Sequence, residues 1–231
     1  MNKRNSFLSI LVFYVIALSL RYITNKTSIL SNIDNEFLKT ILQGIGPAIG
    51  ALVAIKLFNF KILMTLKGDF NNIYFPFLFY WALPVILILI PVFLAKNSFP
   101  IGIVLTVLTY GLLEEIGWRG FLQQVLKPLP RISNILIVAV LWFIWHLNFE
   151  ISVSNLFFFG ILVIGSWGIG LIANKTNSLL AASAFHSLNN FYSELNIQKI
   201  IILAMLVTIW ILTIVYFNKF KKKTISKSLS N

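Results

Sequence analysis

The sequence predicts an all-α, polytopic membrane protein with about eight transmembrane helices and both termini in the cytoplasm. Of its 231 residues, 58% are hydrophobic and only 11% are charged, and the mean hydropathy is +0.86. A soluble domain has about a quarter of its residues charged, so most of this chain cannot face water. Hydrocarbon offers the backbone no hydrogen-bond partner, which favours helices of about 20 residues. We therefore expect residues 1–231 to form a single integral membrane domain.

Eight apolar segments follow one another, separated by polar breaks such as the one at Lys67–Asn72. The first follows Lys3 and Arg4 as a signal peptide would, but it lacks an Ala-x-Ala-like cleavage site and is expected to be a retained helix. The predicted helices are Phe7–Ile23, Phe37–Phe58, Tyr74–Ala95, Ile101–Leu126, Ser133–Phe149, Asn155–Ala173, Ser178–Tyr192 and Lys199–Phe217.

Small residues and prolines predict how some of these helices pack. The second segment contains a GxxxG, Gly46 to Gly50, which is typical of helices in close contact. We expect the same packing role for the glycines of the sixth segment, and kinks at the prolines of the second and third segments. The residues concerned are Gly160, Gly165, Gly168 and Gly170, and Pro47, Pro84 and Pro91.

Charge predicts the orientation of the chain. With the N-terminus inside, thirteen Lys and Arg lie on the cytoplasmic side and five outside, as the positive-inside rule requires. The net charge of +12 does not indicate a nucleic-acid partner, because the basic residues flank apolar runs. The densest cluster forms a basic tail at residues 219–231, suited to anionic lipid. There are no cysteines, which excludes disulfides and a cysteine nucleophile.

Ionisable and amide side chains interrupt three of the apolar segments. An ionisable group at mid-span costs ~2.5–3.5 kcal/mol on insertion scales, so such groups need partners or a water-filled cavity. Arg21, near the outer end of the first segment, is instead expected to extend to the interface. The mid-span residues, all within 111–190, are Glu114, Glu115, Arg119, His146, His186 and Asn190.

The predicted orientation places these residues at one depth, ~12–20 Å from the cytoplasmic ends of their helices. His186 and Asn190 are four residues apart and share a helix face, as do Glu115 and Arg119. Glu114 projects ~100° away from Glu115. One carboxylate can then pair with Arg119 while the other faces a cavity and transfers protons.

A glutamate beside a histidine suits the activation of water, and a second His with an Asn can donate to an oxyanion. Glu114-Glu115-x-x-x-Arg119, an aromatic-x-x-x-His146 and His186-x-x-x-Asn190, on successive segments, resemble the CPBP family. That family includes the CAAX prenyl endopeptidases and bacterial Abi or bacteriocin self-immunity proteins. The resemblance implies an intramembrane endopeptidase acting on a membrane-embedded peptide or protein.

By this resemblance, Glu114 and His146 activate the water, His186 and Asn190 form the oxyanion hole, and Glu115 and Arg119 support the site. One position departs from the family pattern, because Trp142 stands where the family has Phe, four residues before the histidine. We expect a packing role for Trp142.

Metal dependence is the first alternative that the sequence leaves open. Two histidines and a glutamate could hold zinc, with Glu114, His146 and His186 as ligands. There is no His-Glu-x-x-His helix, and Glu150, four residues after His146, lies toward the outer end of its helix. We favour no metal and no other cofactor, because zinc ligands and a separate general base would compete for the same few groups.

Other functions also remain open. The fold could serve as a non-proteolytic immunity protein or bind a membrane partner, or the carboxylates could relay protons in a transporter, although no repeats are visible. A rhomboid-like serine protease fits poorly, because Gly165-Ser166-Trp167-Gly168 is out of register for Gly-x-Ser-Gly. The Lys-, Asn- and Ile-rich composition favours a bacterial plasma membrane.

Overall fold

The computed structural model describes residues 3–69, 74–96, 101–191, 197–202, 204, 205, 208 and 212. Within these residues the protein is all-helical and has no strand. A single isolated bridge joins Thr65 to Ser178 and ties the segment after α3 (Gly46–Phe58) to the start of α10 (Leu179–Phe191). The all-α prediction is confirmed for this part of the chain.

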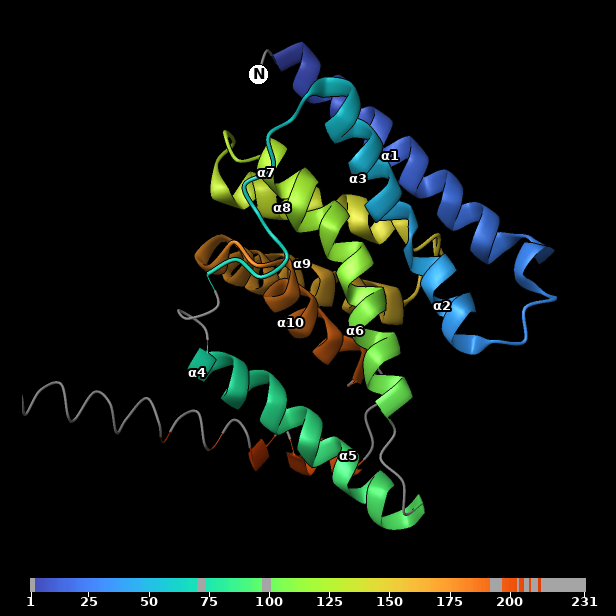
Figure 1. The fold of residues 1–231 in the computed structure, drawn as a ribbon, viewed down its shortest axis with the longest axis vertical. Coiled ribbons are helices and arrows are strands. Elements are labelled where there is room, and N and C mark those ends of the chain that lie inside the picture. Colours follow the sequence, from blue (N-terminus) through green and yellow to red (C-terminus); the bar gives the residue numbers. More distant parts are fainter. Residues whose placement is uncertain are drawn as a thin grey trace, which may run out of the picture.

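Helices occupy the first seven predicted segments, and Figure 1 shows their arrangement. Two stretches are π-helical, one within the third segment and one within the fourth. In chain order the elements are α1 (Lys3–Lys26), the 3-10 turn η1 (Ser28–Leu30), α2 (Glu36–Gly44), α3 (Gly46–Phe58), α4 (Tyr74–Phe77), the π-helix η3 (Leu78–Ala82), α5 (Leu83–Lys96), α6 (Ile101–Glu115), the π-helix η4 (Ile116–Leu122), α7 (Gln123–Val125), α8 (Arg131–Trp145), α9 (Val153–Thr176) and α10 (Leu179–Phe191).

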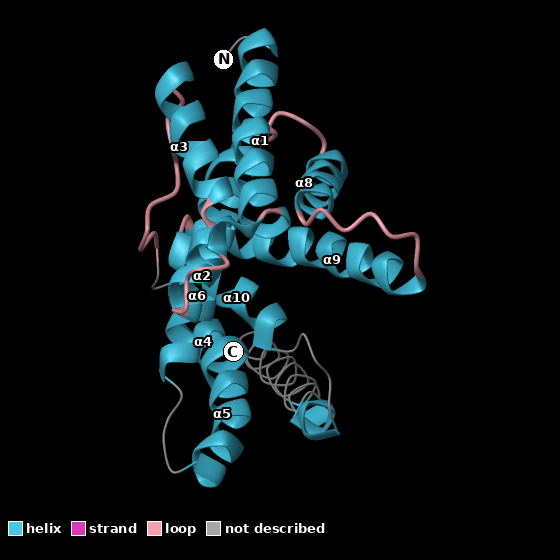
Figure 2. Ribbon diagram, turned by 90° about the vertical axis from the view of Figure 1, so that its right-hand side faces the viewer, coloured by secondary structure: helices cyan, strands magenta, loops and turns pink. Residues whose placement is uncertain are grey.

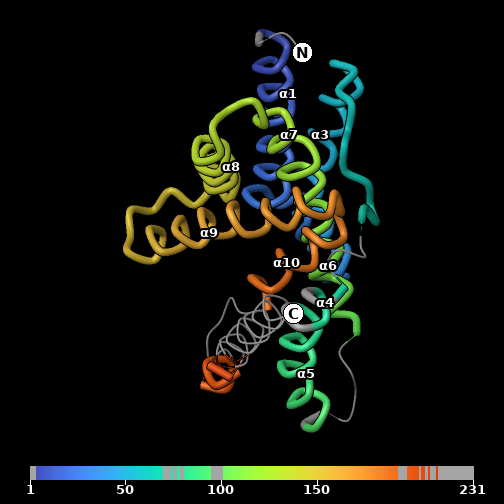
Figure 3. The backbone as a smooth tube through the Cα atoms, turned by 90° about the vertical axis from the view of Figure 1, so that its left-hand side faces the viewer, coloured from blue at the N-terminus to red at the C-terminus, as the bar shows by residue number. Residues whose placement is uncertain are grey.

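The described helices differ in their capacity to cross a membrane. Three runs are long and apolar enough, namely α1, the continuous α6–η4–α7 and α9, and α2 with α3 makes a fourth if this pair, bent by 42°, is one span. At 1.5 Å per residue, α8 and α10 are shorter than a hydrocarbon core of about 30 Å. Figures 2 and 3 show α9 running across the direction of α1, so the long helices are not all parallel.

The count of eight spans and the cytoplasmic termini therefore stay predictions. The eighth predicted segment, Lys199–Phe217, lies largely outside the described residues, and the basic tail at 219–231 lies wholly outside them. The predicted helix end at Phe149 is wrong. α8 ends at Trp145, and Leu147 adopts a left-handed conformation with φ of 55°, which a continuing helix cannot contain.

Close helix contacts occur where glycine removes a side chain. A Cβ on Gly46 would come within 2.7 Å of the Ala17 carbonyl oxygen, so α3 packs against α1 at backbone contact. Pro47 is the second residue of α3 and lies at the bend between α2 and α3, as its missing N–H predicts. The packing role predicted for the glycines of α9 is only half right, because a Cβ on Gly160 or Gly168 would meet no described atom within 4 Å.

Large aromatic side chains fill the core between α1, η4 and α8. Trp118 packs edge-on against Phe13 and Trp145, with ring centroids 5.5 and 6.0 Å apart. Trp142, on α8, joins the same cluster and is 2% exposed. The candidate site lies directly beside this cluster, where α10 packs against α6 and α9.

Candidate active site

The glutamate pair ends α6 at the point where the helix becomes π-helical. Glu114 and Glu115 are 1% and 0% exposed, and η4 begins at the next residue. Single-turn π-helical segments occur often at functional sites. Gly117 lets η4 approach α3, since a Cβ there would stand 2.5 Å from the Pro47 Cβ. The pair is therefore held deep in the helix bundle.

Glu115 is the centre of a buried ionic network. Its Oε1 accepts hydrogen bonds from Arg119 Nη1 at 2.8 Å and from His186 Nδ1 at 2.7 Å. Arg119 also donates through Nη2 to the Gly165 carbonyl oxygen at 3.2 Å, which joins η4 to α9. The pairing of Glu115 with Arg119 predicted from their spacing is confirmed. The continuous helix α6–η4 and α10 thus meet at one carboxylate oxygen, and Arg119 extends the network to α9.

Glu114 is held differently from its neighbour. Its Oε2 accepts one hydrogen bond from Trp142 Nε1 at 2.7 Å and another from Trp118 Nε1 at 3.2 Å. Both bonds are buried, and a bond to an ionised acceptor is about twice as strong as a neutral one. The packing role expected for Trp142 is therefore incomplete, because its indole nitrogen bonds the predicted catalytic carboxylate. A phenylalanine, the residue of the family pattern, could not make this bond.

Trp142 also connects the remaining members of the site. Its carbonyl oxygen lies 2.8 Å from His146 Nδ1, the Arg119 guanidinium lies 4.6 Å from its ring centroid, and the His186 ring lies 5.1 Å away. A carbonyl oxygen only accepts, so Nδ1 of His146 carries the proton. The lone pair of a neutral His146 is then on Nε2.

His146 occupies the boundary between a helix and a loop. It is the C-terminal cap of α8 and is partly exposed, and its ring packs edge-on against Phe158 at 4.8 Å. Both His146 and His186 lie close enough to Glu114 to interact with it electrostatically. Both histidines of the chain therefore lie within electrostatic range of Glu114, and His186 bonds Glu115.

Two residues near Glu114 were not among the predicted site residues. Arg21 is only 9% exposed, donates to the Gln43 carbonyl oxygen at 3.0 Å and lies over the Trp145 ring at 4.3 Å. Its expected extension to the interface is wrong, because it faces inward and interacts with Glu114. The Tyr110 hydroxyl lies within hydrogen-bonding reach of both Glu114 and Arg21. Tyr110 is one helical turn before Glu114, which is the signal that could have identified it.

Asn190 lies one turn after His186 on α10 and is half-buried, whereas His186 is 2% exposed. The shared helix face predicted from their spacing agrees with the continuous helix Leu179–Phe191. Glu150, the other carboxylate near His146 in sequence, is exposed in the loop between α8 and α9.

The donor set does not fit a zinc site. Across the described residues, no three His, Cys, Asp or Glu side chains are grouped so that they could hold a metal ion. One oxygen of Glu114 is occupied by two indole N–H groups, which compete with a metal ion for that oxygen.

A comparison with protein families gives one finding for this site. Residues 96–192 match the family model described as Rce1-like, Type II CAAX prenyl endopeptidase Rce1-like. The match includes every predicted site residue, from Glu114 to Asn190. No curated protein matches the chain.

Proposed function

We propose that the protein is an intramembrane endopeptidase of the CPBP/CAAX protease type that hydrolyses a peptide bond with Glu114 as general base, because residues 96–192 match the Rce1-like family model. The family match and the membrane-competent helices support a multi-pass membrane hydrolase. The observation that carries the mechanism is the buried Glu114 carboxylate, bonded by two indoles and adjoined by two histidines.

The two indole bonds orient the base. They hold Oε2 of Glu114, and in this scheme Oε1 takes a proton from the attacking water, with the Tyr110 hydroxyl as a further partner of the carboxylate. Water adds to the carbonyl carbon of the scissile bond, and the resulting tetrahedral intermediate carries its negative charge on oxygen. The proton then passes to the leaving amine as the carbon–nitrogen bond breaks.

His146 complements Glu114 in this scheme. Its Nδ1–H is engaged by the Trp142 carbonyl, so Nε2 has a lone pair that can accept a hydrogen bond from the same water. A water held by a carboxylate and an imidazole is oriented as well as activated.

His186 and Asn190 form the oxyanion hole of the proposed site. His186 already donates Nδ1–H to Glu115, so it can donate Nε2–H to an oxyanion only as an imidazolium. The Glu115 carboxylate accepts the Nδ1–H of that cation, and the bond from Arg119 holds Glu115 in position. Asn190 would supply a second donor from its side-chain amide.

We propose that the reaction proceeds without a metal, because the functional groups of a general base are present and the donor set does not match zinc. The substrate class is a membrane-embedded peptide or protein, and the proposed location is a bacterial plasma membrane. A prenylated substrate does not follow from the name of the family model, because nothing among the described residues distinguishes a prenyl group from an acyl or aliphatic chain.

A cleavage assay in lipid tests this proposal. Purified protein is incubated with a panel of membrane peptides, and Glu114→Gln is expected to lower kcat/KM by ~10²–10⁴-fold. Glutamine retains an oxygen that can accept both indole bonds, so the fold is preserved. Glu36→Gln is the matched control, because Glu36 is exposed and pairs only with Lys39 on α2.

Adding a chelator to the same assay tests whether cleavage needs a metal ion. Cleavage that persists with the chelator supports a glutamate-type hydrolase. Equal cleavage by wild type and Glu114→Gln would contradict the proposed base. Specific binding of a peptide that neither protein cleaves would favour the alternative, an immunity or partner-binding protein of the same fold.

A further inference from the structure

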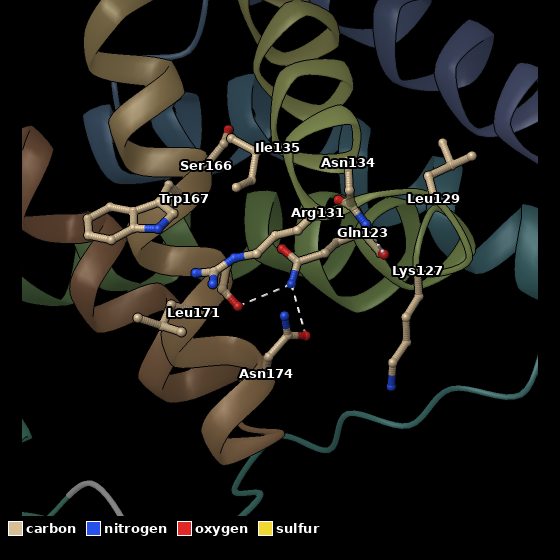
Figure 4. A pocket seen from close by; sticks show the side chains of 11 residues that line it. Gln123, Lys127, Leu129, Arg131, Asn134, Ile135, Ser166, Trp167, Leu171 and Asn174 are labelled. Carbon is tan, nitrogen blue, oxygen red and sulfur yellow. Dashed lines mark hydrogen bonds between the residues drawn. The ribbon is translucent and has the colours of Figure 1, made fainter.

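A second polar region lies apart from the buried carboxylates, between α8 and α9. It is a pocket of about 310 Å³ at the end of the bundle where α7 leads into α8. Polar side chains from α7, the loop, α8 and α9 line it, and Figure 4 shows them from close by. They are Gln123, Lys127, Arg131, Asn134, Ser166 and Asn174.

The charge of this pocket is uncompensated. Lys127 and Arg131 are exposed at its rim, and none of the described residues that line it is acidic. Within the described part of the chain, neither of these two cations forms an ion pair. The first turn of α8 adds to the positive potential, because Arg131 is its first residue and Pro130 provides no side-chain cap. The pocket therefore favours an anion.

The floor of the pocket is held in place by amides. Gln123 Nε2 donates to the Gly170 carbonyl oxygen and to Asn174 Oδ1, both at 3.1 Å. Asn134 Nδ2 donates to the Gln123 carbonyl oxygen at 3.0 Å. Figure 4 shows Lys127 and Arg131 on either side of the Gln123–Asn174 pair. Ser166, also in the lining, is 3% exposed, and its hydroxyl oxygen has no hydrogen-bond partner among the described residues.

Apolar side chains beside the pocket indicate which source of anion it takes. Leu129 lines the pocket and is 43% exposed. Trp167 lines the pocket and is half-exposed, as expected of an aromatic residue at a membrane interface. Such a combination matches a phospholipid, with a phosphate beside acyl chains. A free phosphate would make no use of the apolar flanks.

We infer that the pocket between α8 and α9 binds the phosphate of an anionic phospholipid headgroup through Arg131 and Lys127, with the acyl chains along Leu129 and Trp167. Basic pockets between membrane helices on the cytoplasmic side bind anionic headgroups in this way. The inference is independent of peptide cleavage, since no lining residue belongs to the proposed active site.

Native mass spectrometry of the full chain in detergent tests the site, with phosphatidylglycerol and phosphatidylcholine titrated separately. Wild type is expected to bind the first phosphatidylglycerol at least fivefold more tightly than phosphatidylcholine. Arg131→Gln and Lys127→Gln should each weaken phosphatidylglycerol binding about fivefold, equivalent to about 1 kcal/mol per basic residue. Both side chains are exposed, so these variants leave the core intact.

Lys56→Gln is the matched control, because Lys56 is an exposed lysine in the last turn of α3 and lies outside the pocket lining. It should leave phosphatidylglycerol binding unchanged. Equal weakening by Lys56→Gln and Arg131→Gln would overturn the pocket in favour of diffuse surface charge, and equal affinity for the two lipids would overturn anion selectivity. Inorganic phosphate that binds the wild type as tightly as phosphatidylglycerol would overturn the assignment to a lipid.

Discussion

The buried carboxylate centre, made of Glu114, Glu115, Arg119, Trp142 and His186, contrasts with the pocket between α8 and α9. Each of the five side chains in the centre has a partner within the chain, and none is more than 2% exposed. The pocket instead presents two exposed cations with no ion pair in the described residues. The two regions therefore differ in where their charges find partners: within the chain for the buried centre, and outside the described residues for the pocket.

The largest expected effect on stability comes from removing the positive charge of Arg119 from the buried carboxylate centre. Arg119→Met leaves the buried Glu115 without its guanidinium partner and should lower the free energy of unfolding by about 3–5 kcal/mol. Thermal unfolding in a single detergent measures it. Adding Glu115→Gln to Arg119→Met removes the uncompensated charge and should recover part of the loss. A double variant less stable than the single would contradict this account of the pair.

The next prediction compares the two indole N–H groups, those of Trp142 and Trp118, that donate to Glu114. Trp142→Phe keeps an aromatic ring but removes the smaller ring of the indole together with its N–H, whose bond to a charged group is worth about 1.5–3 kcal/mol. We expect kcat to fall about 10–100-fold with little change in KM, because the indole positions the base and not the substrate. Trp118→Phe, with the longer bond of 3.2 Å, should have a smaller effect. A rise in KM with kcat unchanged would instead assign Trp142 to substrate binding.

Helix packing is close at Gly117, beside the carboxylate centre, and open at Gly168 on α9. Substituting alanine at each position measures this difference. Gly117→Ala places a Cβ against Pro47 and should destabilise the fold by about 1–3 kcal/mol. Gly168→Ala, on the open side of α9, should be neutral or stabilise by up to about 1 kcal/mol. The unfolding temperatures of the two variants compare their stabilities directly. Equal values would show that η4 shifts to accommodate the added methyl group.

The smallest expected effect tests whether the two regions are separable. Arg131→Gln should leave kcat/KM within about twofold of wild type in detergent, since exposed ion contacts contribute little to the fold. The same cleavage assay used for Glu114→Gln provides the number. A loss approaching that of Glu114→Gln would show that the pocket is part of the catalytic region.

Local sequence spacing predicted the part of the site that depends on one helix. Glu115 and Arg119 pair because residues four apart on a helix are neighbours. The contact of His186 with Glu115 joins residues 71 positions apart, so spacing could place both at one depth but could not assign the bond. The Arg21 side chain likewise points inward because it contacts Trp145 and the Gln43 carbonyl. The sequence of the first helix alone does not predict these contacts.

Chemical ambiguity explains the remaining differences. A tryptophan in an apolar helix usually indicates packing, and its N–H becomes a functional group only when an acceptor lies opposite, as Glu114 does for Trp142. The end of α8 could not be predicted from hydropathy, because apolar residues continue to Leu147. The helix ends at Trp145 because the backbone of Leu147 is left-handed. The open positions of Gly160 and Gly168 show that a glycine repeat does not by itself define a packed face.

A paired measurement on the two adjacent glutamates tests the central claim most directly. Cleavage rate and unfolding temperature are recorded for Glu114→Gln and Glu115→Gln in the same lipid and with chelator present. We predict that Glu114→Gln loses cleavage by ~10²–10⁴-fold at an unchanged unfolding temperature, whereas Glu115→Gln lowers the unfolding temperature because Arg119 loses its charged partner. Cleavage by Glu114→Gln at the wild-type rate would contradict Glu114 as the base.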